Sequence, residues 1–131
     1  MTRIVFPLDS VAVVPAPGAD AASAVWSERL AGVIARRLAT CGDVRVVPHA
    51  IVCAEAASER SPEEIARHFN ARCVVRCAVA VDGDALNVQI ELIDALAEVV
   101  IGATSYAILT RDAFCVQSQI TQWLQRRFGG Q

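Results

Sequence analysis

The stretch "VDGDALNVQIELIDA", residues 81 to 95, decides the fold because it joins a turn signal to a regular alternation of side chains. Asp82-Gly83 is a favoured pair for a tight hairpin turn, where glycine adopts a positive φ without steric cost. The run after it alternates: the apolar set is Leu86, Val88, Ile90 and Leu92, and the polar set is Asn87, Gln89 and Glu91. This pattern is typical of an antiparallel strand that is buried on one face and hydrated on the other.

The three aspartates of this stretch are not predicted to form a catalytic group. Asp82 and Asp84 flank the turn, whereas Asp94 lies about ten residues further on, roughly 33 Å along an extended strand. Turn formation explains these acids better than chemistry does.

Further strands and helices are predicted on both sides of this hairpin. Strands are expected at residues 10–15, 43–49, 72–81, 85–94 and 98–109, and helices at residues 21–43, 61–70 and 111–130. Gly42 is placed to end the first helix, and Ser61, Pro62 and Glu64 form a capping box that begins the second, with Asn70 as its left-handed terminator. Residues 49–60 have no clear pattern and are expected to form a loop.

These elements predict one α/β domain over residues 1–131, in the order β-α-β-α-β-β-β-α. Strand-helix-strand units require right-handed crossovers between parallel strands, and hairpins add antiparallel ones. The expected product is a mixed five-stranded sheet of order 2-1-3-4-5 with helices packed on it. Residues 1–9 are a possible extra edge strand or arm, and residues 129–131 a flexible tail.

Composition limits the classes of function. The net charge of −2 gives no field that would attract a nucleic-acid backbone, so no nucleic-acid binding is predicted. No run is long and apolar enough to cross a membrane and no secretory signal is evident, which predicts a cytoplasmic protein without membrane insertion. The hydrophobic fraction of 54% is high for this length and indicates apolar surface left over for a partner.

The cysteines and histidines suggest little chemistry. Five cysteines, at positions 41, 53, 73, 77 and 115, contain no CxxC pair and are expected to be small buried hydrophobes. His49 and His68 are interpreted as isolated, so no metal, cofactor or catalytic residue is predicted. A nucleophilic pair of Cys53 and His49 is kept as a weak alternative because the loop that contains them is unexplained.

The segment after the first strand is a candidate ligand loop. Ligands of open α/β sheets bind beyond the carboxyl ends of strands. The residues concerned are Pro15, Pro17, Gly18, Asp20 and Ser23. Capping of the following helix by Asp20 or Ser23 explains the same residues without a ligand.

Three segments together resemble one known family. They are "VAVVPAPG", "WSERLAGVIARRLATCGDVRVVPH" and "EEIARHFNARCVVRCAVAVDGDALNVQIELIDA", and in order and spacing they resemble the small α/β domain related to the amino-terminal domain of TolB and to FlgO. Ala16, Cys73 and the pair Arg76-Cys77 depart from the family's usual residues, so the chain is similar to a diverged member. The resemblance implies a noncatalytic bacterial interaction or sensing module.

Two functions therefore stay open at the level of sequence. The first is a noncatalytic interaction or accessory domain that binds a protein partner or itself, with Asn87, Gln89 and Glu91 as an exposed sheet face. The alternative is a regulatory domain that binds a small molecule or nucleotide at the loop after strand one.

Overall fold

The computed structural model describes residues 9–17, 20–42, 44–56 and 61–128. The strands are β1 (Ser10–Pro15), β2 (Arg45–Val46), β3 (Cys73–Asp82), β4 (Ala85–Asp94) and β5 (Val99–Leu109). The helices are α1 (Ala21–Cys41), α2 (His49–Ala56), α3 (Pro62–His68), the short 3₁₀ helix η1 (Thr110–Asp112) and α4 (Ala113–Phe128). The expected amino-terminal arm, apart from Asp9 at its end, and the expected tail at residues 129–131 lie outside the described residues.

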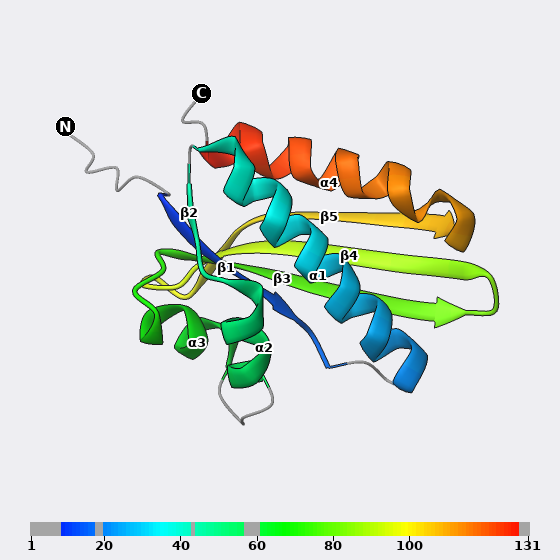
Figure 1. The fold of residues 1–131 in the computed structure, drawn as a ribbon, viewed down its shortest axis with the longest axis horizontal. Coiled ribbons are helices and arrows are strands. Elements are labelled where there is room, and N and C mark those ends of the chain that lie inside the picture. Colours follow the sequence, from blue (N-terminus) through cyan, green and yellow to red (C-terminus); the bar gives the residue numbers. More distant parts are fainter. Residues whose placement is uncertain (1–8, 18–19, 43, 57–60, 129–131) are drawn as a thin grey trace.

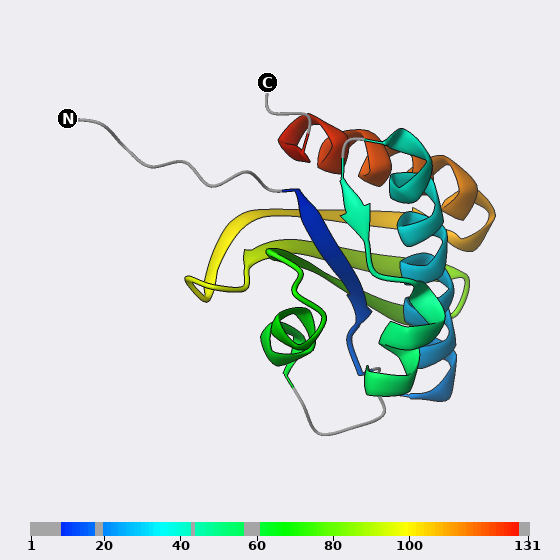
Figure 2. The same cartoon turned by 60° about the vertical axis from the view of Figure 1, so that its left-hand side comes forward.

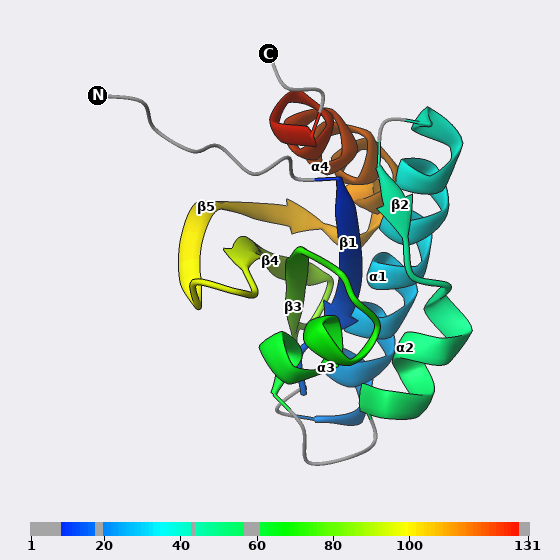
Figure 3. The same ribbon diagram turned by 90° about the vertical axis from the view of Figure 1, so that its left-hand side faces the viewer.

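The five strands form one mixed sheet in the order β2-β1-β3-β4-β5, which confirms the predicted topology. β1 pairs in parallel with β2 and β3, whereas β3, β4 and β5 are joined as antiparallel neighbours. Figure 1 shows α1 and α4 lying across one face of this sheet. Turning the molecule shows α2 and α3 near β1, where they leave much of the opposite face of β3, β4 and β5 uncovered (Figures 2 and 3).

The main core lies between the sheet and the pair α1 and α4. The predicted apolar face of β4 is buried there, and its exposed fraction is at most 2% at Leu86, Val88, Ile90 and Leu92. A smaller core on the other face joins β1 to α2 and α3. Its buried members include Val14, Val52, Ile65, Val74 and Ile93.

Helix α1 begins and ends where the sequence indicates. The Asp20 carboxylate accepts a hydrogen bond from the Ser23 N–H at 2.8 Å, so Asp20 is the N-cap. Gly42 follows the helix with φ 78°, a conformation that glycine adopts without a Cβ penalty. Leu30, Ile34 and Leu38 face the main core at helical spacing.

Two serines of α1 complete the hydrogen bonding of β3. Because β1 is shorter than β3, no strand of the described residues pairs with the last part of β3 on that edge. Ser27 Oγ accepts a hydrogen bond from the Val79 N–H at 2.9 Å, and Ser23 Oγ accepts one from the Val81 N–H at 3.0 Å. The two hydroxyls therefore replace a missing neighbouring strand.

The segment expected as a loop at residues 49–60 was predicted wrongly in part. His49–Ala56 form helix α2, while residues 57–60 lie outside the described residues. Val52 is the residue of α2 that the second core buries completely. Among the described side chains of α2, Val52 is the one that is buried, and a single buried residue gives no helical periodicity. The sequence pattern therefore did not show the helix.

The predicted start and end of the second helix are confirmed, whereas the strand expected at residues 43–49 is reduced to Arg45–Val46 and the hairpin turn is shifted by one residue. Ser61 and Glu64 form the expected capping box at α3, and Asn70 adopts a left-handed φ of 58°. The hairpin turn consists of Gly83 and Asp84, not Asp82 and Gly83, because Asp82 pairs with Ala85 in the ladder. Gly83, with φ 62°, thus occupies the first position of the turn.

Candidate functional site

The polar face of β4 lies on an open part of the sheet. Asn87 and Gln89 are exposed, and Glu91 is half-buried beside Arg76, whose Nη1 lies 3.4 Å from its carboxylate. We use the name open face for the side chains that surround them on β3, β4 and β5. Its residues are Arg76, Ala78, Ala80, Asn87, Gln89, Glu91, Ala103, Ser105 and Ala107.

Strand β5 forms one edge of the sheet and carries apolar side chains on its surface. Its eleven residues, VVIGATSYAIL, contain neither a charge nor a proline. We define the edge patch as four apolar residues at the start of this strand and in the turn before it. They are Leu96, Val99, Val100 and Ile101, with exposed fractions of 65%, 52%, 50% and 43%.

Natural edge strands are commonly protected by charges, proline, a bulge or a covering segment. In the described part of the chain, β5 has one such feature, a bulge where Leu92 and Ile93 pair with Gly102 and Val100 and leave Ile101 without a partner. Its turn and first residues extend beyond both helix layers in Figure 3. The patch therefore combines exposed apolar area with backbone groups that can pair with another strand.

Asp94 holds the turn that carries the edge patch. Arg72 donates to its carboxylate from Nη2 at 2.7 Å and from Nε at 3.1 Å. The N–H groups of Leu96 and Ala97 donate to Oδ1 at 3.0 and 3.2 Å. The hydrogen bonds from Arg72, followed by those from the backbone, hold the pKa of Asp94 below its ordinary value although burial opposes them. Asp94 is therefore structural, as the sequence indicated, and Arg72 is a partner that the sequence reasoning missed.

The proposed ligand loop after β1 is partly committed to structural hydrogen bonds. Asp20 caps α1 and Ser23 accepts from β3, while Pro15 is half-buried and Pro17 exposed. Gly18 lies outside the described residues.

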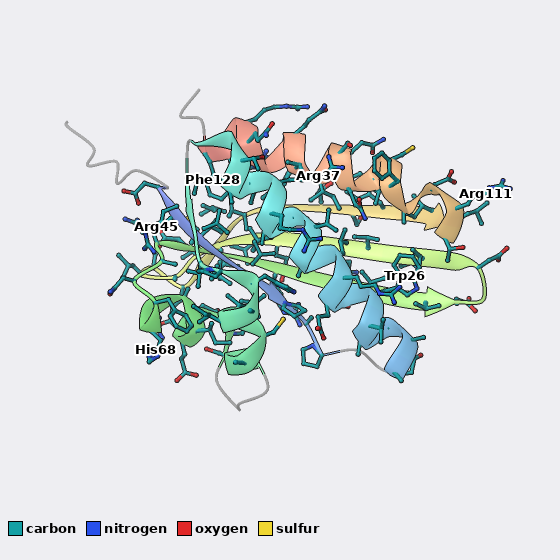
Figure 4. The ribbon with its side chains drawn as sticks, viewed as in Figure 1. Trp26, Arg37, Arg45, His68, Arg111 and Phe128 are labelled. Carbon is teal, nitrogen blue, oxygen red and sulfur yellow. The ribbon has the colours of Figure 1, made fainter. Side chains whose placement is uncertain are left out.

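A cavity of about 430 Å³ lies elsewhere, between α1, α4 and the hairpin of β3 and β4. Its apolar lining includes Trp26, Leu86, Val88, Ile108 and Val116. Figure 4 shows Trp26 on α1 beside the hairpin and Arg37 between α1 and α4. None of the described residues of the loop after β1 lines this cavity.

A second cluster joins α1 to α2, and here the sequence interpretation was wrong. Cys53 lies four residues after His49 on α2, so this histidine does have a potential ligand at helical spacing. Cys53 Sγ lies 3.2 Å from His49 Nε2. Glu28 of α1 completes the group, because the three ligand atoms all lie within 4.8 Å of one another. The signal that could have found the pair is the His-x₃-Cys spacing of His49 and Cys53, which the interpretation of His49 as isolated overlooked.

The electrostatics of this cluster do not favour a nucleophile. Burial lowers the pKa of His49, opposed by the Glu28 carboxylate, and burial followed by the charge of Glu28 raises the pKa of the Cys53 thiol. A reactive cysteine needs the opposite shifts, toward a thiolate beside an imidazolium. At neutral pH the pair is therefore a thiol beside a neutral imidazole.

The other cysteines divide between the core and the surface. Cys73 and Cys77 are buried on β3, and burial raises the pKa of each thiol to about 12. Cys115 is exposed on α4, and the side chain of Cys41 lies outside the described ones. The expectation of small buried hydrophobes thus holds for Cys73 and Cys77 but not for Cys115.

No family model and no curated protein matches this chain. Among the described residues, no helix is both long and apolar enough to span a bilayer.

Solved structures do resemble it. TolB from Acinetobacter baumannii has a TM-score of 0.64 at 11% identity, covering 95% of this chain but only 29% of TolB. Lipoprotein GNA1162 from Neisseria meningitidis has a TM-score of 0.61 at 18% identity, over 88% of this chain and 96% of the lipoprotein. A PelC dodecamer from Paraburkholderia phytofirmans has a TM-score of 0.57 at 22% identity, over 100% and 96%. The resemblance expected from the sequence is therefore confirmed at the level of structure: this chain has the TolB-like fold that these bacterial proteins share.

Proposed function

We propose that this chain is a noncatalytic interaction domain that associates with a second copy of itself through the free edge of β5. The observation that carries the proposal is the edge patch. Its four exposed apolar side chains adjoin an uncharged strand, and no other strand of the described residues pairs with the outer backbone groups of that strand. Such an edge gains both apolar burial and main-chain hydrogen bonds when another strand pairs with it.

A second copy is the partner that fits this edge most simply. Two β5 strands related by a two-fold axis run antiparallel and bring the same patch against itself. The pairing would extend the five-stranded sheet from one copy into the next. The PelC structure, which aligns with the whole of this chain, is described as a dodecamer and supports self-association as a property that this fold permits.

The open face is a second surface that could take part in binding. It would run continuously across two copies joined at β5, with Asn87, Gln89 and Glu91 repeated in each. Polar side chains on a flat sheet surface provide the hydrogen-bonding rim of a protein interface more readily than a small-molecule pocket. We therefore assign these residues to contact with a further protein partner.

Sedimentation velocity over a range of protein concentrations tests self-association. We expect the unmodified chain to form dimers or larger species, and Val100→Asp to raise the dissociation constant at least about tenfold, because each interface then buries two carboxylates. Val25→Asp is the matched control: Val25 is 47% exposed on α1, away from the patch, and its variant should associate normally. A strictly monomeric unmodified chain at high concentration would contradict the proposal.

The cavity beside Trp26 favours a second candidate function, a regulatory domain that binds a small apolar molecule. Its volume lies within the range of ordinary ligand sites. Its lining combines apolar side chains with polar and charged ones, which are Glu28, Arg29, Arg36, His49 and Gln117. This moves the alternative from the loop after β1 to the groove between α1 and α4. A ligand there should raise the thermal midpoint and change Trp26 fluorescence, and a Trp26→Ala variant that keeps the same ligand-induced rise would exclude this site.

The location of this protein in the cell is a further part of the proposal that can be tested. One neighbour is described as a lipoprotein, so the comparisons do not support the cytoplasmic location predicted from the sequence. Cells that express the natural gene can be fractionated and the protein detected in each fraction. This measurement shows whether the protein is in the cytoplasm, as the sequence predicted, or in another fraction.

A further inference from the structure

We propose that Glu28, His49 and Cys53 form a binding site for a zinc-like divalent transition metal that fastens α2 to α1. These residues lie apart from the edge patch, and Glu28 and His49 also line the cavity beside Trp26. The ligand atoms of the three residues lie within 4.8 Å of one another, and Cys53 Sγ lies 3.2 Å from His49 Nε2. Ligands around one tetrahedral zinc are about 3.5 Å apart, given bond lengths of roughly 2.0–2.3 Å. Small rotamer changes would therefore bring all three atoms onto one ion.

The backbone of α1 is shaped for the imidazole. Gly32 lies one turn after Glu28, and a Cβ on it would come within 3.0 Å of both Cδ2 and Nε2 of His49. Such a contact is closer than side-chain carbons normally approach, so any larger residue would push His49 away from Glu28. Glycine at position 32 thus lets the ring approach α1 on the side where the carboxylate stands.

The donor set selects the kind of metal. A thiolate, an imidazole and a carboxylate together suit a borderline-soft ion such as Zn²⁺, whereas Ca²⁺ and Mg²⁺ prefer oxygen alone. Three protein ligands leave a fourth position for water or for a group from a partner. His49 and Cys53 are partly exposed and Glu28 is exposed, so an ion can reach the site from solvent.

The surrounding charges permit a divalent ion. Arg36 lies one turn after Gly32 on α1, and its positive charge lies close to His49. Its side chain is long and exposed, so its guanidinium can move away from the site into solvent when an ion binds. Binding releases the proton of the Cys53 thiol, so the thiolate and the Glu28 carboxylate together neutralise the two charges of the ion.

The metal would add a direct link between two helices. Val52 is fully buried in the second core, and it is the completely buried residue among the described side chains of α2. A metal bound by two residues of α2 and one of α1 would join the helices by coordinate bonds in addition to this packing. Metal binding should accordingly raise the thermal midpoint of unfolding.

Titration with Co²⁺ tests the site directly, using the full chain without an affinity tag, freed of metal by a chelator and kept reduced by a phosphine. We expect one Co²⁺ per chain, with tetrahedral visible bands and a near-ultraviolet band from the thiolate, displaced by Zn²⁺. Cys53→Ser and His49→Gln should each weaken binding more than about 100-fold, beyond the 10- to 100-fold typical of losing an outer-shell partner. Gly32→Ala should also weaken it, by displacing the ring.

Cys115→Ser is the matched control, because it removes an exposed thiol outside the cluster and should leave the spectrum unchanged. Circular dichroism confirms that each variant is folded before it is compared. The proposal is overturned if no thiolate band forms with Co²⁺ in excess, or if the band persists in Cys53→Ser or His49→Gln.

Discussion

Replacing Asp94 by alanine should destabilise this protein by about 3 kcal/mol, because the carboxylate is the shared acceptor of a half-buried network. The side chains of Arg72 and Asp94 are only 16% and 12% exposed, so the guanidinium left behind is poorly hydrated. The variant also removes the acceptor of the hydrogen bonds from the N–H groups of Leu96 and Ala97. Breaking a fully buried ion pair costs about 3–5 kcal/mol, and the partial exposure here places the value at the lower end.

Urea unfolding followed by tryptophan fluorescence measures this loss, with Trp26 and Trp123 as internal probes. Asp94→Asn should cost less than Asp94→Ala, because its amide oxygen still accepts from the turn while the ionic pair is lost. Asp84→Ala is the matched control: its carboxylate is exposed in the hairpin turn, so the variant should lie within about 0.5 kcal/mol of the unmodified chain. A loss below about 1 kcal/mol for Asp94→Ala would refute this account of the turn.

The same network predicts a dependence on pH. Arg72 and the backbone donors lower the pKa of Asp94 in the folded state, so the unfolded chain binds its proton more readily. The contribution of Asp94 is therefore complete above its unfolded pKa of about 3.9 and is lost as the pH falls through the lower folded pKa. The difference in unfolding free energy between the unmodified chain and Asp94→Asn should be constant near neutral pH and narrow in acid. A difference that does not change down to about pH 2 would contradict the assignment.

Two further substitutions test other contacts. Ser27→Ala should cost about 1–3 kcal/mol in urea unfolding, because the Val79 N–H then has no acceptor in a buried place, whereas Ser105→Ala on the open face should change little. Gly102→Ala should cost about 1–3 kcal/mol and shift Trp123 fluorescence, because its Cβ would lie 3.2 Å from the indole and 3.0 Å from Arg127 Nε. Unchanged stability of Ser27→Ala, or an unchanged spectrum of Gly102→Ala, would count against these contacts.

The sequence predicted the sheet well where the alternation of apolar and polar residues and the turn-forming residues indicate the same strand. Strand β4 alternates without exception from Leu86 to Leu92, so its buried face followed from the pattern alone. The caps at Asp20, Ser61 and Gly42 were equally local signals, since each needs only its own hydrogen bonds or φ angle. Even there, the turn lay one residue later than Asp82-Gly83 indicated, because the register of a hairpin is set by the whole ladder.

The candidate sites depended on contacts between segments, which no local pattern shows. Arg72 meets Asp94 because β3 and β4 pair with Cys73 opposite Asp94, and this register follows only once the turn position is fixed. Glu28 meets His49 and Cys53 because α2 packs against α1, and this is a tertiary contact. The predicted order 2-1-3-4-5 already placed the last strand at an edge of the sheet, but which of its apolar side chains stay exposed depends on how the helices cover that sheet.

Hydrogen exchange along β5 tests the central claim, self-association through the sheet edge, most directly. In an isolated copy, the outward-pointing amides of Val99–Leu109 have no partner strand and should exchange quickly, while those bonded to β4 are protected. The account predicts that the outward amides become protected as the protein concentration rises, and that Val100→Asp prevents this. Exchange of these amides that is independent of concentration, in a chain that nevertheless associates, would contradict it by placing the interface elsewhere.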